Sequence, residues 1–167
     1  IQPLDDYTGI ADIASGVETK ARGTITAIYS RGFVMNDGTA SILTYLNATH
    51  EYVAGDVVEV SGTATTFNGV LQFPKESTVK LVANKANFTL PTPEVLDAAA
   101  MDAILTTPSF KYISYTGVLT ISGSYYNVTI NGAATAIGSI QYPVTGLVDA
   151  SWDGEVVTVT GYMVGIS

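Results

Sequence analysis

Residues 55–62 read GDVVEVSG, and residues 154–161 read GEVVTVTG. In both phrases a glycine precedes alternating apolar and polar residues, which is the period-two pattern of a half-buried β-strand. The phrases differ at three positions, and one lies in each half of the chain. This near-identity predicts that the same structural unit occurs twice.

The same turn and strand signals precede both phrases. Asn36-Asp37-Gly38 and Asn131-Gly132 lie between short apolar runs, a pattern that favours two-residue hairpin turns because these residues adopt positive φ at low cost. Further upstream, Gly23 and Gly117 interrupt long alternating strands, where a glycine lets a strand bend and serve two sheets. The inward-facing residues are predicted to be Ala21, Gly23, Ile25 and Ala27 in the first unit and Ile113, Tyr115, Gly117, Leu119 and Ile121 in the second. The outward-facing ones are predicted to be Lys20, Arg22, Thr24 and Thr26, and Ser114, Thr116, Val118 and Thr120.

A helical lead-in is predicted before each unit. In residues 92–105, Thr92 is a candidate N-cap and Pro93 fits the first helical position, and the helix should end before Pro108. A shorter equivalent covers residues 10–14. The boundary is therefore placed in the TLPTP segment, which gives domains 1–91 and 92–167.

The predicted order of elements describes the OB-fold, a partly open five-stranded Greek-key barrel. In the first unit a last strand should run from Val70 through Phe73 to Val82, after a tight turn at residues 67–69. The chain is thus predicted to be mainly all-β, with two tandem OB-fold barrels, each with a short helical lead-in.

The second predicted barrel lacks most of its last strand, since only YMVGIS follows the repeated strand. An open sheet edge invites pairing with a strand of a neighbouring chain. Alternatively, the sequence simply ends before that strand, or the N-terminal segment closes the barrel irregularly.

The stretch RGFVMNDGTASILTYL (31–46), followed by AGDVVEVSGTATTFNGVLQF (54–73), resembles the OB-fold class called nucleic-acid-binding-like. It is most similar to tandem OB modules in secreted proteins and lipoproteins of Bacteroidetes, closely over residues 17–84 and more weakly over residues 110–167. The resemblance implies a binding module that is extracellular or on the cell surface. Because residue 1 is Ile, a removed N-terminal segment could have carried an export signal or a lipid anchor.

OB-folds usually bind ligands across strands two and three, between the loops that join strands one to two and four to five. In the first unit these loops contain residues 29–33 and 66–69. The candidate ligand-binding residues there are Tyr29, Arg31, Phe33 and Phe67, together with Lys20 and Arg22 on the preceding strand. The rings would stack on bases or sugars; alternatively, they are core or turn residues. In the second unit Tyr125 and Tyr126 suit a neutral ligand or fill the barrel.

The net charge of −8 disfavours strong binding to phosphates. Residues 1–91 hold six of the seven basic residues and nine acidic ones, whereas residues 92–167 hold only Lys111 and six acids. The sequence therefore favours a glycan or protein ligand. A weak single-stranded nucleic-acid binder that uses the first barrel is the alternative, and a structural subunit of a surface assembly is a third hypothesis.

Catalysis has little support in the sequence. His50 is the one histidine, cysteine is absent, and no nucleophile elbow is present, so His50 is predicted to be a surface residue or to pack in a connector. The acids at residues 149–155 lack the spacing of a calcium loop. We therefore expect no catalytic residue, no metal and no cofactor, and the absence of a long apolar run predicts no transmembrane segment.

Overall fold

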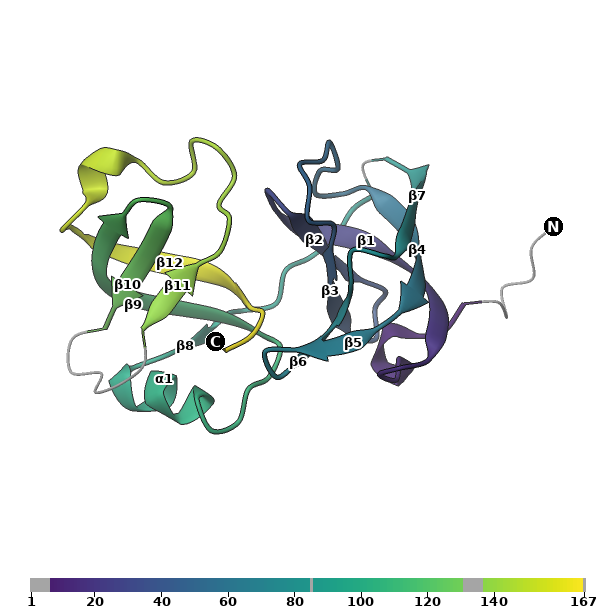
Figure 1. The fold of residues 1–167 in the computed structure, drawn as a ribbon, viewed down its shortest axis with the longest axis horizontal. Coiled ribbons are helices and arrows are strands. Elements are labelled where there is room, and N and C mark those ends of the chain that lie inside the picture. Colours follow the sequence, from purple (N-terminus) through teal and green to yellow (C-terminus); the bar gives the residue numbers. More distant parts are fainter. Residues whose placement is uncertain (1–6, 85, 131–136, 167) are drawn as a thin grey trace. The chain divides into compact units, whose positions relative to one another are not determined.

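The computed structural model describes residues 7–84, 86–130 and 137–166. The fold is mainly β, with one sheet in each of two compact units, Ile1–Leu90 and Pro91–Ser167 (Figure 1). The division between Leu90 and Pro91 lies within the TLPTP segment. Across the described residues, no helix is long and apolar enough to cross a membrane.

The first unit contains a seven-stranded sheet in the order β5-β6-β3-β2-β1-β4-β7. Only Ala64 separates β4 from β5, so one continuous segment pairs with β1 through β4 and with β6 through β5, and the sheet curls into a half-barrel. The strands are β1 (Glu18–Tyr29), β2 (Gly32–Asn36), β3 (Ser41–Tyr45), β4 (Val57–Thr63), β5 (Thr65–Phe67), β6 (Val70–Phe73) and β7 (Thr78–Ala83), preceded by the 3-10 helix η2 (Ile10–Asp12).

The predicted alternation of β1 holds for its first half only. Ala21 and Ile25 are fully buried in the core of the first unit. A register shift between Ile25 and Ala27 then interrupts the pairing of β1 with β2. Because such a bulge adds a residue to one strand, Thr26 is buried and Ala27 is only half-buried, so the predicted orientations of these two residues are wrong.

Two turns of the first unit differ from the sequence prediction. The connection between β2 and β3 contains four residues, 37–40, rather than two. The strand predicted over residues 70–82 is broken after Phe73, where Ser77 N–H donates to the Pro74 carbonyl in a turn. Proline has no N–H to donate to a strand ladder, which favours the break. The turn at Asn68 (φ 50°) and Gly69 (φ 85°) is confirmed, and two positive φ values define a type I′ hairpin.

The second unit has the sheet order β11-β10-β9-β12, with β8 parallel to the start of β9. Its core gathers side chains from α1 and the inner face of the sheet, and the predicted inward positions Ile113, Tyr115 and Leu119 are confirmed. The elements are β8 (Glu94–Val95), α1 (Ala98–Ile104), β9 (Lys111–Ser122), β10 (Tyr125–Thr129), β11 (Gly138–Ile140), η3 (Ala150–Trp152) and β12 (Val156–Met163).

The helix of the second unit begins later than predicted. Asp97, not Thr92, is the N-cap of α1, and its carboxylate accepts a hydrogen bond of 2.8 Å from the Ala100 N–H. Residues 94 and 95 instead pair with β9, and Glu94 forms a 3.4 Å ion pair with Lys111. Tertiary strand pairing therefore overrides the local helix signal of Pro93. The hairpin predicted at residues 131–132 lies outside the described residues.

The first of the two repeated phrases is anchored to the bend of β1. Gly55 N–H donates to the Ile25 carbonyl, and Ile25 N–H donates to the Asp56 carbonyl, both at 2.8 Å. Gly23, two residues before Ile25, faces Val58 of β4 across the strand pair. Gly55 has a φ of 98°, a conformation that favours glycine.

The second phrase makes the same contacts in its own unit. Gly154 N–H donates to the Leu119 carbonyl at 2.7 Å, and Leu119 N–H donates to the Glu155 carbonyl at 2.9 Å. Gly117, two residues before Leu119, faces Val157 of β12. The repeated phrase thus fixes the same junction twice.

In the first unit β7 pairs with the far edge of β4, but no described strand pairs with the corresponding edge of β12.

Candidate ligand-binding cleft

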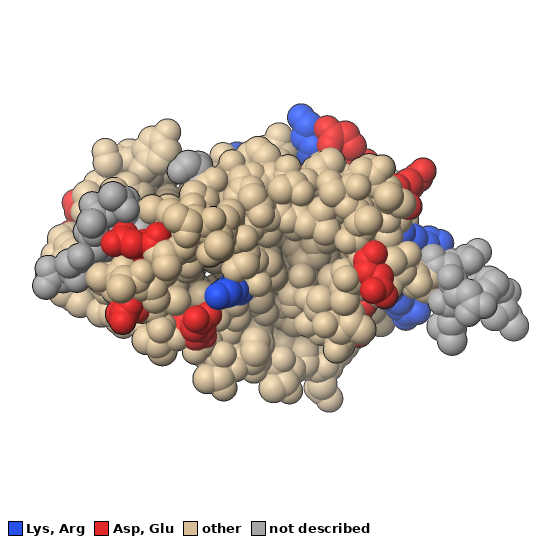
Figure 2. All heavy atoms as spheres, turned by 90° about the horizontal axis from the view of Figure 1, so that it is seen from below, with Lys and Arg blue, Asp and Glu red and all other residues tan. Residues whose placement is uncertain are grey.

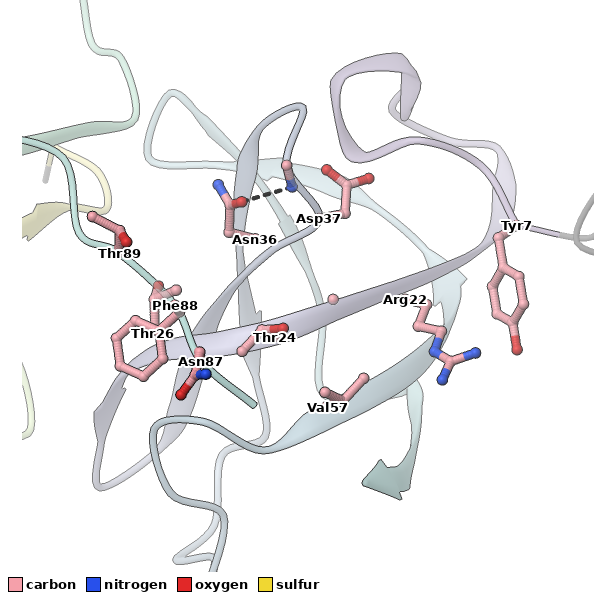
Figure 3. A pocket seen from close by; sticks show the side chains of 12 residues that line it. Tyr7, Arg22, Thr24, Thr26, Asn36, Asp37, Val57, Asn87, Phe88 and Thr89 are labelled. Atoms are coloured by element: carbon pink, nitrogen blue, oxygen red, sulfur yellow. Dashed lines mark hydrogen bonds between the residues drawn. The ribbon is translucent and has the colours of Figure 1, made fainter. Parts of the chain in front are cut away.

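A cleft of about 510 Å³ lies in the first unit, along the outer side of β1. Figure 3 shows residues 87–89 beside β1 at one end of the cleft and Tyr7 and Arg22 at the other. The end of β2 and the loop after it form a further wall. The lining residues are Tyr7, Arg22, Gly23, Thr24, Thr26, Asn36, Asp37, Gly38, Val57, Asn87, Phe88 and Thr89.

Tyr7 is held in place by two charged side chains. Its hydroxyl donates to Glu59 Oε2 at 2.7 Å, and Lys20 Nζ lies 3.3 Å from Glu59 Oε1 and 5.4 Å from the centre of the Tyr7 ring. The hydrogen bond from Tyr7 holds the pKa of Glu59 below its ordinary value and raises the pKa of Tyr7. Each carboxylate oxygen of Glu59 therefore has a partner, the Tyr7 hydroxyl for Oε2 and the Lys20 ammonium for Oε1.

Asp37 organises the loop after β2. Its Oδ1 accepts from the N–H of Thr39 at 2.9 Å and from the Thr39 hydroxyl at 2.6 Å, while Oδ2 accepts from the Ile10 N–H at 2.8 Å. Partial burial acts to raise the pKa of Asp37, but hydrogen bonds from Thr39, Ile10 and Ala40 outweigh it and hold the pKa below its ordinary value. Asp37 is an ionised structural residue that joins η2 to this loop.

Asn36 is likewise part of the loop structure. Its side-chain Nδ2 donates to Ser41 Oγ at 2.9 Å, and Oδ1 accepts from the Gly38 N–H at 2.7 Å (Figure 3). Each of these atoms retains capacity for a second hydrogen bond. Asn36 can therefore contact a ligand without losing its role in the turn.

Three further polar side chains of the cleft, those of Arg22, Asn87 and Thr89, have no hydrogen-bond or ion-pair partner among the described residues. The Arg22 guanidinium is exposed, and so are the side chains of Asn87 and Thr89. Between the latter two, Phe88 is 39% exposed. This segment is placed by the Ala86 N–H, which donates to the Gly55 carbonyl at 2.6 Å.

The face predicted from the sequence is separate from this cleft. Phe33 is fully buried and contacts Tyr52 edge-on, with ring centres 5.5 Å apart, so it is a core residue. Arg31 donates to the Asn47 carbonyl at 3.2 Å, and Tyr29 is half-buried. Phe67 is 57% exposed at the tip of the β5–β6 hairpin. None of these four residues lines the cleft.

The two tyrosines predicted in the second unit differ in environment. Tyr125 is 68% exposed at the start of β10, whereas Tyr126 is half-buried and packs against the core of its unit. Of the eight residues predicted as ligand contacts, only Arg22 lines the cleft. The sequence does not predict that Tyr7 and residues 87–89 line the same cleft, because no local pattern connects segments so far apart.

His50 has a structural role in the connector after β3. Its Nε2 lies 2.8 Å from the carbonyl oxygens of Tyr29 and Gly32, and Nδ1 accepts from the Tyr52 N–H at 3.2 Å. Of the two predicted roles, these contacts support packing in the connector. In the described part of the chain, no group of three or more His, Cys, Asp and Glu residues could hold a metal ion.

No family model matches the chain, and no curated protein matches it in sequence.

Proposed function

We propose that this chain is a non-catalytic binding module built on two OB-type units, and that the cleft beside β1 binds a glycan. The single observation that carries the proposal is the cleft itself. An exposed amide and an exposed hydroxyl lie beside a partly exposed aromatic ring there, with an exposed guanidinium toward the other end, and none of the three polar groups has a hydrogen-bond or ion-pair partner within the part of the chain that the structure describes.

The strand pairing supports the OB assignment of the first unit. β1 pairs with β4 through its first half and with β2 through its second half, as expected of a long strand shared between two sheets. β3 pairs with β2 and, in parallel, with β6. In the second unit β9, β10 and β12 pair in the same way as β1, β2 and β4, which favours a related second module.

The chemistry of the cleft supports a sugar ligand. Sugars present hydroxyl groups to amides, hydroxyls and charged side chains, and their apolar ring faces stack on aromatic side chains; OB-folds are known to bind oligosaccharides. Arg22 and Phe88 lie toward opposite ends of the cleft (Figure 3), which suits an extended chain of sugar residues. On the face shown in Figure 2, Lys and Arg side chains are few and scattered and form no continuous basic stripe of the kind that nucleic-acid binding needs.

The proposal of a non-catalytic module rests on the surroundings of the one histidine. Both ring nitrogens of His50 are occupied by backbone groups, so neither is available as a general base. The extracellular or surface location rests on the resemblance to secreted OB modules and is part of the same proposal.

A panel of neutral and acidic polysaccharides tests this function by affinity electrophoresis. We expect at least one polysaccharide to retard the protein, and Phe88→Ala to weaken that binding about tenfold, because a ring that stacks on a ligand contributes on the order of 1–3 kcal/mol. Phe67→Ala is the matched control, since Phe67 is an exposed ring of the same unit outside the cleft. A panel without any retardation contradicts the proposal, and so does binding that depends on Phe67 instead.

Single-stranded nucleic acid is the second candidate ligand, favoured by a row of side chains across three strands. Glu59 of β4 faces Arg22 of β1 on one side and Lys80 of β7 on the other, and Lys20 is bound to the same carboxylate. Titration of fluorescent oligo-dT at low and physiological salt tests it. Binding that collapses with salt and requires Arg22 would favour this candidate over a glycan.

A further inference from the structure

We infer that the cleft of the first unit recognises a carboxylate on its glycan, and that Arg22 is the group that binds it. The ligand class is therefore an acidic polysaccharide that contains uronic acid residues. This inference rests on the proposed glycan-binding function and specifies its ligand.

The two described carboxylates near Arg22 are bound by other groups. Glu59, which faces Arg22 across the β1–β4 pair, binds the Tyr7 hydroxyl with one oxygen and Lys20 with the other. Asp37, on the cleft wall, accepts hydrogen bonds from Ile10 and from its own loop. Neither carboxylate has a hydrogen bond or an ion pair with Arg22.

Among the described residues, the Arg22 guanidinium of the cleft therefore has no carboxylate bound to it. A guanidinium presents parallel N–H donors that match the two oxygens of a carboxylate, and such bidentate pairs are stronger than hydrogen bonds between neutral groups. The groups at the other end of the cleft suit further sugar residues of the same chain: Asn87 and Thr89 offer an amide and a hydroxyl, and Phe88 offers a ring face.

A uronic acid chain fits this arrangement better than a phosphodiester chain. Nucleic acids owe most of their affinity to several cations in a row, whereas among the described residues Arg22 is the one Lys or Arg that lines the cleft, in a unit whose acidic residues outnumber its basic ones. A polysaccharide can instead bind through one of its carboxylates, while its hydroxyl groups and ring faces supply the other contacts. Lys20, the nearest additional cation by strand position, is bound to Glu59. A carboxylate on an extended sugar chain matches the guanidinium at one end of the cleft, and the hydroxyl groups of the chain match the polar neutral groups at the other end.

The second unit supplies an internal contrast. Arg22 directly precedes the bending glycine of β1, and Thr116 directly precedes the bending glycine of β9. The Thr116 hydroxyl lies 2.8 Å from the Thr158 hydroxyl, in the place where the first unit has the pair of Arg22 and Glu59. The equivalent surface of the second unit thus lacks the cation, and we assign carboxylate recognition to the first unit alone.

Carboxyl reduction provides a direct test of this inference. The full chain is titrated with polygalacturonate, alginate and hyaluronan, each beside its carboxyl-reduced neutral counterpart, and binding is measured by calorimetry. We expect at least one acidic polysaccharide to bind about tenfold more tightly than its reduced form, the factor typical of one charge-assisted hydrogen-bonded pair.

Two arginine variants locate the effect. Arg22→Gln should make the acidic and reduced forms bind equally, whereas Arg31→Gln, the matched control at an arginine outside the cleft, should leave the preference intact. Circular dichroism checks that both variants are folded. Equal binding of acidic and reduced forms by the wild type, with loss on Phe88→Ala, overturns the carboxylate inference and leaves the glycan function standing. If neither form of any polysaccharide binds, the carboxylate inference and the glycan-binding function are both contradicted. If oligo-dT then binds and its binding requires Arg22, the guanidinium binds phosphate instead.

Discussion

The two units share a strand junction and differ on the surface around it. In both, a repeated Gly-x-Val-Val strand exchanges backbone hydrogen bonds with the long bent strand, two residues after the bending glycine. On the outer face, however, the first unit places Arg22 opposite Glu59, and the second places Thr116 opposite Thr158. The residues that fix the strands are thus repeated, whereas the outward residues that determine ligand chemistry are not.

The helical lead-ins differ in how they are capped. The seven-residue α1 begins at its own cap, Asp97. The three-residue η2 has no cap of its own; instead, the carboxylate of Asp37, from the loop after β2, accepts from the Ile10 N–H. The residue directly before the longer helix supplies its cap. The shorter helix depends on a hydrogen bond to the loop that also forms a wall of the cleft.

The largest expected effects come from truncating the equivalent core residues Ile25 and Leu119. Each is fully or almost fully buried, so replacement by alanine should lower the free energy of unfolding of its own unit by about 2–5 kcal/mol. Trp152 is the only tryptophan and belongs to the second unit, so its fluorescence follows that unit. Leu119→Ala should shift the fluorescence transition in urea, and Ile25→Ala should not. An equal shift by both variants would mean that the two units unfold together.

The two bending glycines should differ in their tolerance of a side chain. A Cβ on Gly117 would overlap the carbonyl oxygen of Thr129, whereas a Cβ on Gly23 would lie 3.0 Å from the carbonyl oxygen of Asn36. Gly117→Ala should therefore cost about 1–3 kcal/mol, and Gly23→Ala less. Thermal unfolding of the two variants measures both costs; a larger loss for Gly23→Ala would contradict the difference in packing.

Acid should weaken the first unit through Asp37. Because folding lowers the pKa of this carboxyl, the ionised form stabilises the folded state above the ordinary pKa of aspartate, about 3.9. That contribution is lost as the pH falls through the lower, folded pKa. Asp37→Asn should be less stable at neutral pH and should show a shallower loss of stability below about pH 4. Unfolding in urea as a function of pH, followed by circular dichroism, tests this; parallel profiles for variant and wild type would exclude the role.

Arg22 should have the smallest effect on stability. The guanidinium has no hydrogen-bond or ion-pair partner among the described residues, so Arg22→Ala should change the free energy of unfolding by less than about 0.5 kcal/mol. Binding of acidic polysaccharides should fall in the same variant. A large loss of stability would show that Arg22 supports the fold rather than a ligand.

The sequence predicted the strands better than the site. The repeated valines, Gly23 and Gly117 could be found because strand alternation and glycine bends are local signals. The β-bulge after Ile25 and the strand pairing of Glu94 could not, since both depend on partner strands distant in the sequence. Local propensity gives no information on such pairing.

The cleft was missed for a related reason. Its walls come from Tyr7, β1, the loop after β2 and residues 87–89, which only the fold brings together. The usual ligand-binding face of OB-folds predicts a ligand on Phe33 and its neighbours instead. Burial of Phe33 in the core removes the central ring of that platform.

Backbone amide NMR tests the location of the site most directly. The ¹⁵N-labelled chain is titrated with oligosaccharides cut from polygalacturonate, alginate and hyaluronan in turn, and the shifted amides are mapped. The account predicts shifts at Arg22, Thr24 and residues 87–89 for at least one of the three, with the second unit unchanged. Shifts confined to the Phe67 hairpin or to Tyr125 and Tyr126 would contradict it.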